Sequence, residues 1–379
     1  MTKKHAVLSA SSSNRWLHCP PSVRLSESFE NKSSEFAKQG TDAHELCEFK
    51  LHQLLGDAGI DPTPNLAYYD EEMEVCATAY ATYVMEELNK AKQVSKDPIV
   101  IVEQQLDFSR FVPEGFGTGD CLIIADETLS VIDYKHGLGV LVDAYENPQM
   151  MCYALGALEL FDGIYDISQV KMTIFQPRRE NVSTYTIQKE ELMQWGNDVL
   201  TPAAKLAFNG EGEFQCGKWC GFCPAKYSCK ARAEYNLELV KKEFREANLL
   251  SDDEIEEVLV KVDNLVSWAN DIKEYALKQA LNGKIWADFK LVEGRATRKY
   301  SNDNDVAAAV IKAGFNPYDK KLLGVTAMTK ELGKSKFEEI LGDYIIKPKG
   351  KLTLVPMSDK RKAVEIQTAA DEFKNMEDK

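Results

Sequence analysis

The apolar positions in the first half of the chain follow two different periods. Apolar residues recur at helical spacing over 41–55, 71–94 and 147–160, which predicts three helices. Short runs rich in β-branched residues predict strands near 99–106, 119–125, 129–135, 170–175 and 183–187. The resulting order, helices followed by three strands, a helix and two strands, predicts an α/β protein with a mixed central sheet flanked by helices.

Residues with strong capping preferences mark two helix starts. Thr41 is the predicted N-cap of the first helix, with Asp42 and Glu45 in its first turn, where carboxylates suit the helix dipole. Ser251-Asp252-Asp253-Glu254 has the form of a capping box and predicts a long, charged helix over 252–282.

Composition narrows the class of protein. The 379 residues contain no apolar run approaching the roughly 20 residues that span a bilayer, and no apolar stretch follows the N-terminal lysines. We therefore expect a cytoplasmic protein without a signal peptide and without a membrane partner. The net charge of −14 argues against a protein that coats nucleic acid, but leaves room for an enzyme with a local basic cleft.

Two predicted strands each carry one aspartate out of an apolar run. Asp120 ends a glycine-rich turn, Gly117-Thr118-Gly119, and Asp133 is followed two positions later by Lys135. Side chains alternate along a strand, so Asp133 and Lys135 project on the same side. Carboxylate oxygens suit Mg²⁺ or Mn²⁺, and a neighbouring lysine can orient a water molecule toward a phosphodiester.

Two helices add further polar residues in a fixed order along the chain. His44 lies on the first helix, in Gly40-Thr41-Asp42-Ala43-His44. Gln149 and Tyr153 open the helix after the Asp133 strand, and their i, i+4 spacing places them on one helix face.

Together these motifs resemble the RecB-like branch of the PD-(D/E)XK nuclease superfamily over about residues 9–232, closest to an uncharacterised phage-encoded group. The resemblance implies a restriction-endonuclease-like core, with the imidazole of His44 and the backbone carbonyl of Tyr134 as metal ligands beside the two aspartates. It implies that Gln149 and Tyr153 orient Lys135 or the phosphate. Glu103, on the preceding strand, is only an outer-sphere candidate.

The function this implies is a metal-dependent DNA nuclease, an exonuclease of phage DNA replication or recombination. Its partners would be DNA, as single strands or duplex ends, and a phage recombination protein or helicase. The alternatives are a catalytically silent DNA-binding protein that keeps the nuclease fold, and a zinc-stapled adaptor without DNA affinity.

Four of the nine cysteines are clustered as C-x3-C-x2-C-x5-C, at Cys216, Cys220, Cys223 and Cys229. An odd number of cysteines without a secretory signal argues against a disulfide framework, so the cluster predicts a metal centre. Thiolates suit both tetrahedral zinc and iron–sulfur clusters, so the cysteines alone leave the metal open.

The resemblance favours a [4Fe–4S] cluster. AddB-type helicase–nuclease subunits and CRISPR-associated exonucleases place one cysteine before the nuclease core and three after it, spaced C-x2-C-x5-C. Cys19 occupies the lone position, and the trio matches Cys220, Cys223 and Cys229. Cys216 departs from this pattern, as a spare thiol or as the replacement for Cys19 in a local zinc site.

Composition changes after the cysteines, and this predicts two domains. Residues 1–240 would form the nuclease domain with the metal centre at its end. Residues 241–379 would form an accessory domain, a long helix plus a small α+β region. Arg178 and Arg179, at the end of a predicted strand, are candidates for phosphate contacts.

Overall fold

A computed structural model describes residues 6–29, 35–57, 59–240, 251–292, 302–312, 318, 328 and 332–345. The chain divides into two compact units, Met1–Lys284 and Ile285–Lys379. The long helix α9 (Asp252–Leu281) therefore belongs to the first unit, whereas the composition change assigned it to the accessory part. Every candidate site residue also lies in the first unit.

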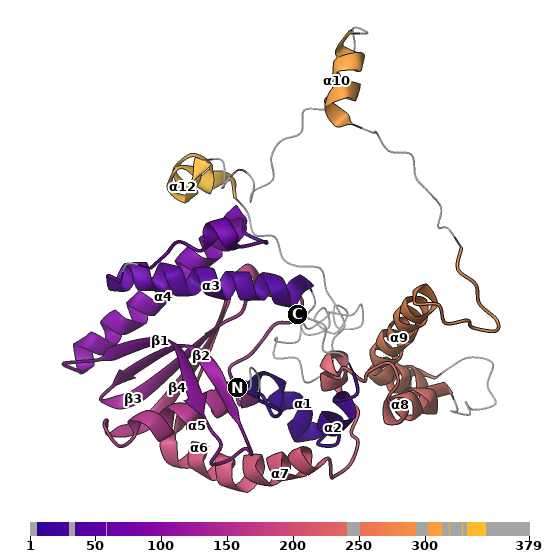
Figure 1. Ribbon diagram of the computed structural model, residues 1–379. Coiled ribbons are helices and arrows are strands. Elements are labelled where there is room, and N and C mark those ends of the chain that lie inside the picture. Colours follow the sequence, from indigo (N-terminus) through magenta and orange to yellow (C-terminus); the bar gives the residue numbers. More distant parts are fainter. Residues whose placement is uncertain are drawn as a thin grey trace, which may run out of the picture. The chain divides into compact units, whose positions relative to one another are not determined.

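A five-stranded mixed sheet forms the centre of the first unit, as the sequence predicts (Figure 1). The strands lie in chain order across the sheet; β3 and β4 are parallel and all other neighbours are antiparallel. They are β1 (Ile99–Asp107), β2 (Phe116–Ala125), β3 (Glu127–Tyr134), β4 (Ile167–Gln176) and β5 (Asn181–Gln188). The single parallel pair follows from the crossover through helix α5, which separates β3 from β4.

Helices cover both faces of this sheet, and each face has its own apolar core. Helices α3 (Glu35–Leu55) and α4 (Glu71–Val94) pack on one face. The other face carries α5 (Pro148–Phe161), α6 (Lys189–Trp195) and α7 (Thr201–Asn209), with the short N-terminal helices α1 (Ser13–His18) and α2 (Ser22–Ser26) against α7.

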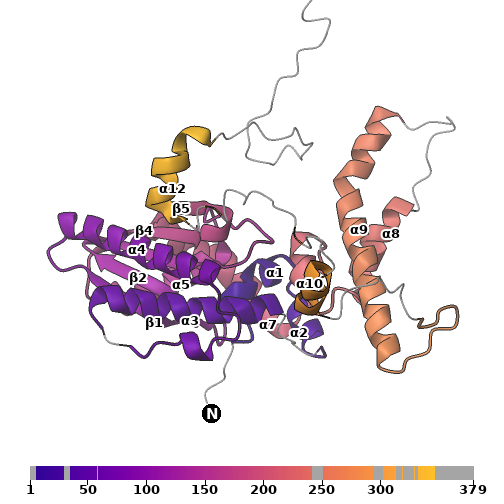
Figure 2. The ribbon, with the colours of Figure 1, turned by 90° about the horizontal axis from the view of Figure 1, so that it is seen from above.

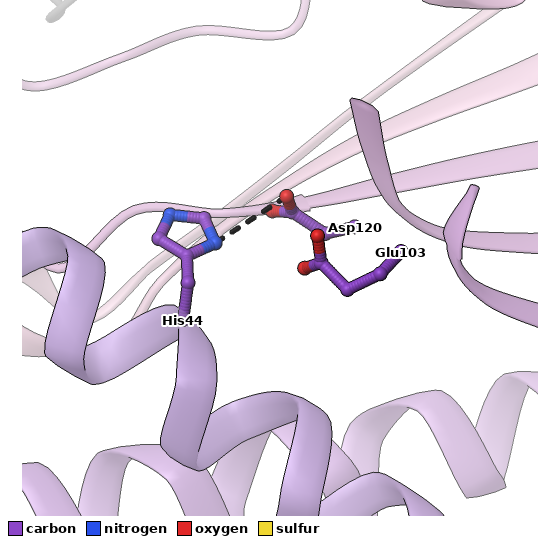
Figure 3. A group of neighbouring side chains, drawn as sticks. All are labelled: His44, Glu103 and Asp120. Atoms are coloured by element: carbon purple, nitrogen blue, oxygen red, sulfur yellow. Dashed lines mark ion pairs between the residues drawn. The ribbon is translucent and has the colours of Figure 1, made fainter. Parts of the chain in front are cut away.

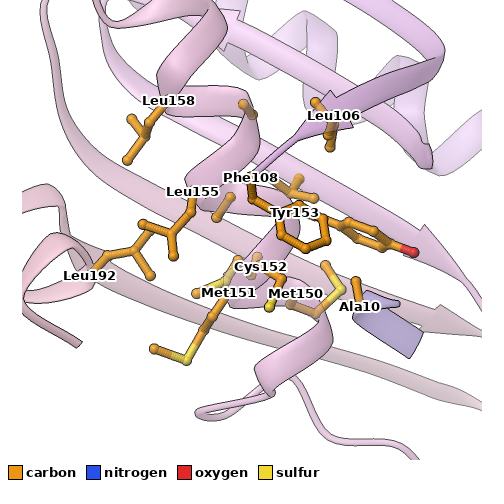
Figure 4. Packing of buried hydrophobic residues seen from close by; sticks show 14 of the residues in the cluster. Ala10, Leu106, Phe108, Met150, Met151, Cys152, Tyr153, Leu155, Leu158 and Leu192 are labelled. Atoms are coloured by element: carbon orange, nitrogen blue, oxygen red, sulfur yellow. The ribbon is translucent and has the colours of Figure 1, made fainter. Parts of the chain in front are cut away.

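Helix α5 is apolar on nearly all sides because it lies between the sheet and α1 and α6. Figure 4 shows Met150, Tyr153 and Leu155 of this helix in the same apolar cluster as Leu106 and Phe108. Asn147 caps the helix by accepting hydrogen bonds from the N–H groups of Gln149 and Met150. The cap and the core together fix the position of Gln149 at the start of the helix.

The predicted cap at Thr41 is wrong. Helix α3 begins at Glu35, and the Thr41 hydroxyl donates to the carbonyl of Ala37 at 3.1 Å, as threonines inside helices do. The Asp42 carboxylate instead accepts the backbone N–H of Tyr68 at 2.8 Å. His44 remains on the helix, and its imidazole reaches Asp120 of β2.

Helix α9 begins with the predicted capping box. The Ser251 hydroxyl accepts from the N–H of Glu254 at 3.4 Å, and the Glu254 carboxylate accepts from the N–H of Ser251 at 2.9 Å. Helix α8 (Lys230–Val240) lies alongside α9 (Figure 2). The second unit contains α10 (Asp303–Lys312) and α12 (Lys334–Leu341), and the rest of the expected α+β region falls largely outside the described residues.

Candidate functional site

The ladder between β1 and β2 is interrupted at one pair of residues. Residues 99–102 pair with 121–124 and residues 104–107 with 116–119, so Glu103 and Asp120 face each other where no backbone pairing occurs. Glu103 has a φ of 51°, a left-handed conformation that costs a residue other than glycine about 1–2 kcal/mol. A charged residue held in a strained conformation in the middle of a strand is a sign of a functional site.

Side chains change faces across this interruption. Ile101 and Leu106 both pack in the core under α5, although an odd and an even position of a regular strand point to opposite faces. In β2, Cys121 packs against α3 and α4, yet a Cβ on Gly119 would point at Leu106, at 2.9 Å. The break at Glu103 thus turns Asp120 toward helix α3 instead of leaving it in the core under α5.

The two glycines before Asp120 lie inside β2 and not in the predicted turn. A Cβ on Gly117 would come within 2.8 Å of the Tyr153 ring, and one on Gly119 would meet Leu106. Glycine is therefore required here by close packing against α5 and β1. This packing places Tyr153 directly beside the strand that carries Asp120.

The backbone pairing between β2 and β3 ends one residue pair before Asp120 and Asp133. Its last pair is Cys121 with Ile132. Beyond it, Oδ2 of Asp120 accepts the backbone N–H of Tyr134 at 2.7 Å, in place of a backbone carbonyl. The strands separate at this point, and the carboxylate of Asp120 occupies the opening.

Three potential metal ligands meet in this opening. Ligand atoms of His44, Glu103 and Asp120 all lie within 4.8 Å of one another (Figure 3). They come from α3, β1 and β2, and Nδ1 of His44 lies 3.3 Å from Oδ1 of Asp120. One imidazole and two carboxylates form a donor set that suits Mn²⁺ and, through its oxygens, Mg²⁺.

Asp133 and Lys135 form a second group on the neighbouring strand. Oδ2 of Asp133 lies 2.7 Å from Nζ of Lys135, as their shared side of the strand predicts. The amide of Gln149 donates to Oδ1 of Asp133 at 3.2 Å and approaches the Tyr153 hydroxyl at 3.3 Å. Gln149 therefore holds the aspartate, whereas the sequence led us to expect it to act on Lys135 or the phosphate.

The buried oxygen Oδ2 of Asp133 receives no hydrogen bond from the described residues. Its contact with Lys135 satisfies the distance of an ion pair, but not the geometry of a hydrogen bond. A buried carboxylate oxygen with a lone pair left open fits a site built to hold a cation.

Electrostatics also fit a cation. Burial acts to lower the pKa of His44, but the carboxylates of Asp120 and Asp133 together outweigh it and raise this pKa to about 9. Burial, and then the charge of Asp120, raise the pKa of Glu103 to about 7. Without metal, the imidazolium of His44 thus supplies the positive charge that the carboxylates require.

The pKa values of Asp120 and Asp133 are shifted in opposite directions. Burial acts to raise the pKa of Asp120, but His44, Lys135 and the N–H of Tyr134 together lower it. Burial and the charge of Asp120 raise the pKa of Asp133 despite its contact with Lys135. Burial would lower the pKa of Lys135, yet the two carboxylates raise it, so this lysine stays protonated at neutral pH.

Sequence reasoning underrated one member of this site. Glu103 contributes directly to the ligand group, although it was expected only in the outer sphere. Asp120, Asp133, Lys135, His44, Gln149 and Tyr153 lie together as their motif order predicts. The backbone carbonyl of Tyr134 as a ligand remains a prediction.

All five cysteines singled out in the sequence line one pocket, next to the C-terminal end of α1. Cys19, at the end of α1, meets the loop between α7 and α8 there, and Arg15, Lys226 and Arg232 line the same pocket. The loop cysteines are Cys216, Cys220, Cys223 and Cys229. Cys19 thus lies close to the trio despite a separation of some two hundred residues.

The thiols of this pocket influence one another. The Cys216 thiol donates a hydrogen bond to the sulfur of Cys220. This hydrogen bond, together with the N–H of Gly217 and the charge of Arg232, lowers the pKa of Cys220 to about 6. Burial raises the pKa of Cys19, and the charges of Cys220 and Cys223 add to this effect. A thiolate at Cys220 at neutral pH is the form that binds metals.

The candidate phosphate-binding arginines flank the first site. Arg178 pairs with Glu72 at 2.9 Å and reaches the carbonyl of His136. Arg179 donates to the carbonyl of Leu138 at 2.8 Å. Both arginines thus contact the loop that follows Lys135.

No helix in the described parts of the chain combines the length and apolar character needed to cross a membrane. Among solved structures, one described as "Crystal structure of SSO0001" is 14% identical and covers 51% of this chain and 98% of its own, with a TM-score of 0.23. A likeness this weak carries no argument about fold or function.

A family model described as "Protein of unknown function (DUF2800)" matches residues 5–362, nearly the whole chain and both of its compact units. The chain therefore belongs to this DUF2800 family.

Proposed function

We propose that this protein is a metal-dependent DNA nuclease with a PD-(D/E)XK, RecB-like core. The observation that carries the proposal is the meeting of His44, Glu103 and Asp120 beside the Asp133–Lys135 pair. They meet where the β1–β2 pairing is interrupted at one residue pair and the β2–β3 pairing ends. The order of these residues along the chain matches the motif order of that superfamily. Regular structural packing gives no reason to strain Glu103 at this position.

Asp120, Glu103 and Asp133 would hold Mg²⁺ or Mn²⁺ through oxygen atoms, with His44 completing the set after losing its proton. A bound metal supplies Lewis-acid polarisation of a phosphodiester and a water of lowered pKa. The tight packing of the glycines in β2 keeps Asp120 in place for this role.

Lys135 acts in this proposal as a fixed positive charge. Because its pKa is raised, it stays protonated, so it orients the attacking water and offsets charge on the pentavalent transition state rather than acting as a base. Gln149 holds the Asp133 carboxylate through its amide, and Tyr153 holds Gln149. The substrate would be DNA, attacked from an end, in phage replication or recombination with a recombination protein or helicase as partner.

The proposal is tested by degradation of end-labelled linear DNA, single- and double-stranded, with Mg²⁺ or Mn²⁺. Asp133→Ala is compared with the wild type and with Asp162→Ala, a control at an exposed aspartate at the end of α5. We expect degradation that chelator and Asp133→Ala abolish and that the control retains. Intact DNA in every lane, with wild-type protein still bound to it, would favour the catalytically silent DNA-binding protein.

For the cysteine pocket we propose a [4Fe–4S] cluster held by Cys19, Cys220, Cys223 and Cys229. Support comes from the thiolate character of Cys220 and from the position of Cys19 beside the trio. Arg15, Lys226 and Arg232 also line the pocket, and the last two of these cations are paired with Asp271. Iron, labile sulfide and zinc are measured in anaerobically purified protein; one zinc per chain without iron would replace this proposal by the zinc alternative.

A further inference from the structure

The loop 137–146, between β3 and α5, exposes apolar side chains. Leu138 is 46% exposed, Val140 55%, Leu141 56% and Tyr145 56%. Three aliphatic side chains within four residues form a contiguous apolar tip, and single scattered exposures would need no explanation. The neighbouring glycines, Gly137 and Gly139, have open space where a Cβ would lie, so none of the described residues packs over this tip from their side.

This apolar tip stands on a fixed backbone. Gln176, at the end of β4 and 1% exposed, donates to the carbonyls of Gly137 and Val140 at 2.7 and 2.8 Å. Its carbonyl oxygen accepts the N–H of Val142 at 3.2 Å. A buried side chain thus fixes the loop at three points, and Asn181 adds a bond to the carbonyl of Val142 at 2.8 Å. The exposed aliphatic groups are therefore presented rigidly.

Both ends of the loop carry residues of the candidate site. Lys135 lies two positions before Gly137, and Gln149 lies in the first turn of the helix that follows. Arg178 and Arg179 bond to the carbonyls of His136 and Leu138 on the same stretch. The apolar tip therefore follows the Asp133–Lys135 pair directly and lies beside two arginines, of which Arg178 is also paired with Glu72.

We infer that this tip, formed by Leu138, Val140 and Leu141, is a wedge that contacts the bases at the end of a DNA duplex and separates the terminal pair. The inference rests on the proposed nuclease function and names its substrate, a duplex end. Aliphatic side chains inserted between bases unstack them, while arginines contact the phosphates. A protein partner fits the aliphatic groups, but gives no reason for arginines and a nucleophile-orienting lysine on the same stretch.

The wedge makes one strand available to the site. A duplex end presents paired bases, and opening a terminal pair costs a few kcal/mol. An apolar tip that covers the exposed base faces offsets this cost. DNA that is already single-stranded or forked does not need it, so the wedge affects duplex ends selectively.

The experiment compares the full chain carrying Leu138→Ser, Val140→Ser and Leu141→Ser with the wild type and with Ile164→Ser. Ile164 is another exposed aliphatic residue, after α5, away from this loop. Substrates are a blunt duplex, the same duplex with a splayed end, and a single strand. We expect the triple variant to lose at least about tenfold in rate on the blunt duplex and less than about twofold on the other two.

A second readout is terminal 2-aminopurine fluorescence in duplex bound by Asp133→Ala protein, with or without the triple change. The wedge predicts an increase that the triple change removes. Equal duplex cleavage by wild type and triple variant overturns the wedge while the nuclease proposal stands, and leaves the tip to contact another protein. No cleavage of any substrate by the wild type overturns the nuclease proposal and the wedge with it.

Discussion

One carboxylate, that of Asp120, binds both the backbone of Tyr134 and the imidazole of His44. Its Oδ2 accepts the Tyr134 N–H at 2.7 Å, and its Oδ1 lies 3.3 Å from Nδ1 of His44. Asp120 thus joins β2, β3 and α3 at the point where the β2–β3 ladder ends. Structural and chemical roles of this residue can be separated, because an amide keeps the first contact and loses the charge that makes the second.

Asp120→Asn should therefore abolish activity while preserving the fold. We expect at least about a 100-fold loss of DNA degradation, because the ligand charge is gone. Asp120→Ala should lose the same activity and also be less stable by about 1–3 kcal/mol, because the Tyr134 N–H is left without an acceptor. Thermal unfolding of both variants without metal checks this difference. Equal stability of the two variants would mean that the Tyr134 N–H does not depend on Asp120.

Glu103→Gly and Glu103→Ala should weaken metal binding to the same extent, but the two variants should differ in stability. Both remove a carboxylate from the ligand group, so both should bind Mn²⁺ at least about tenfold more weakly. Glycine adopts the left-handed conformation of residue 103 freely, so Glu103→Gly should be the more stable by about 1 kcal/mol. Calorimetric titration with Mn²⁺ tests the expected loss of affinity, and thermal unfolding tests the expected difference in stability. An alanine variant as stable as the glycine variant would show that position 103 is not strained.

Metal affinity should rise with pH between about 6 and 9. His44 must lose its proton to bind a metal, and Asp120 raises its pKa to about 9 in the metal-free protein. At pH 7 metal binding therefore releases protons from His44 and, with its pKa of about 7, from Glu103. Mn²⁺ titrations in buffers of different ionisation enthalpy measure the protons released. The His44→Gln variant should release fewer protons on binding Mn²⁺, and its metal affinity should depend less steeply on pH. If the pH dependence of its metal affinity is unchanged, His44 is not a ligand.

Cys216→Ser and Cys220→Ser should differ in iron content. Cys220 is one of the four proposed ligands, so its replacement should remove the cluster, whereas Cys216→Ser should retain iron and sulfide at wild-type levels. Serine at 216 also loses the thiol contact that lowers the pKa of Cys220, so loading should become more sensitive to low pH. The opposite pattern, with Cys216 required and Cys19 dispensable, would assign a local zinc site to the loop.

Helix α9 is joined to α8 by a buried ion pair and to the cysteine loop by a second, less buried one. Arg232 donates to Oδ2 of Asp271 at 2.6 Å, and Lys226 lies 2.7 Å from the other oxygen. Asp271→Asn leaves the buried Arg232 without its counter-charge, so we expect a destabilisation of about 3 kcal/mol and faster proteolysis of α8 and α9. Asp263→Asn, at an exposed position of the same helix, is the control. Equal proteolysis of both variants would show that the pair contributes nothing to the position of α9.

Apolar periodicity predicted the sheet and its main helices because burial decides those elements. Four of the five predicted strands fall within those observed, the fifth (129–135) runs one residue past the end of β3, and α4 has the predicted bounds. The start of α3 was missed because Thr41, a good capping residue, also fits inside a helix by bonding back to Ala37. The capping preference of threonine gave the wrong helix start because a hydrogen bond inside the helix satisfies the same hydroxyl.

The role of Glu103 could not be read from the sequence for a different reason. Regular alternation along β1 does not predict a left-handed residue in the middle of the strand, and only that break turns Asp120 toward α3. Its one signal was a charged residue between apolar and amide-bearing positions of a β-rich run. Motif order, in contrast, was sufficient to bring Asp133, Lys135 and Gln149 together.

The cysteine pocket is built from two segments that a ribosome makes far apart in time. Cys19 emerges early, whereas Cys216 to Cys229 emerge only after every strand of the sheet has been synthesised. Sheet folding can therefore start on the nascent chain before the pocket exists. A chain arrested within the sheet carries Cys19 without its partners and cannot hold a cluster. Loading of the proposed cluster would therefore mark the chains whose first unit has been completed through the cysteine loop.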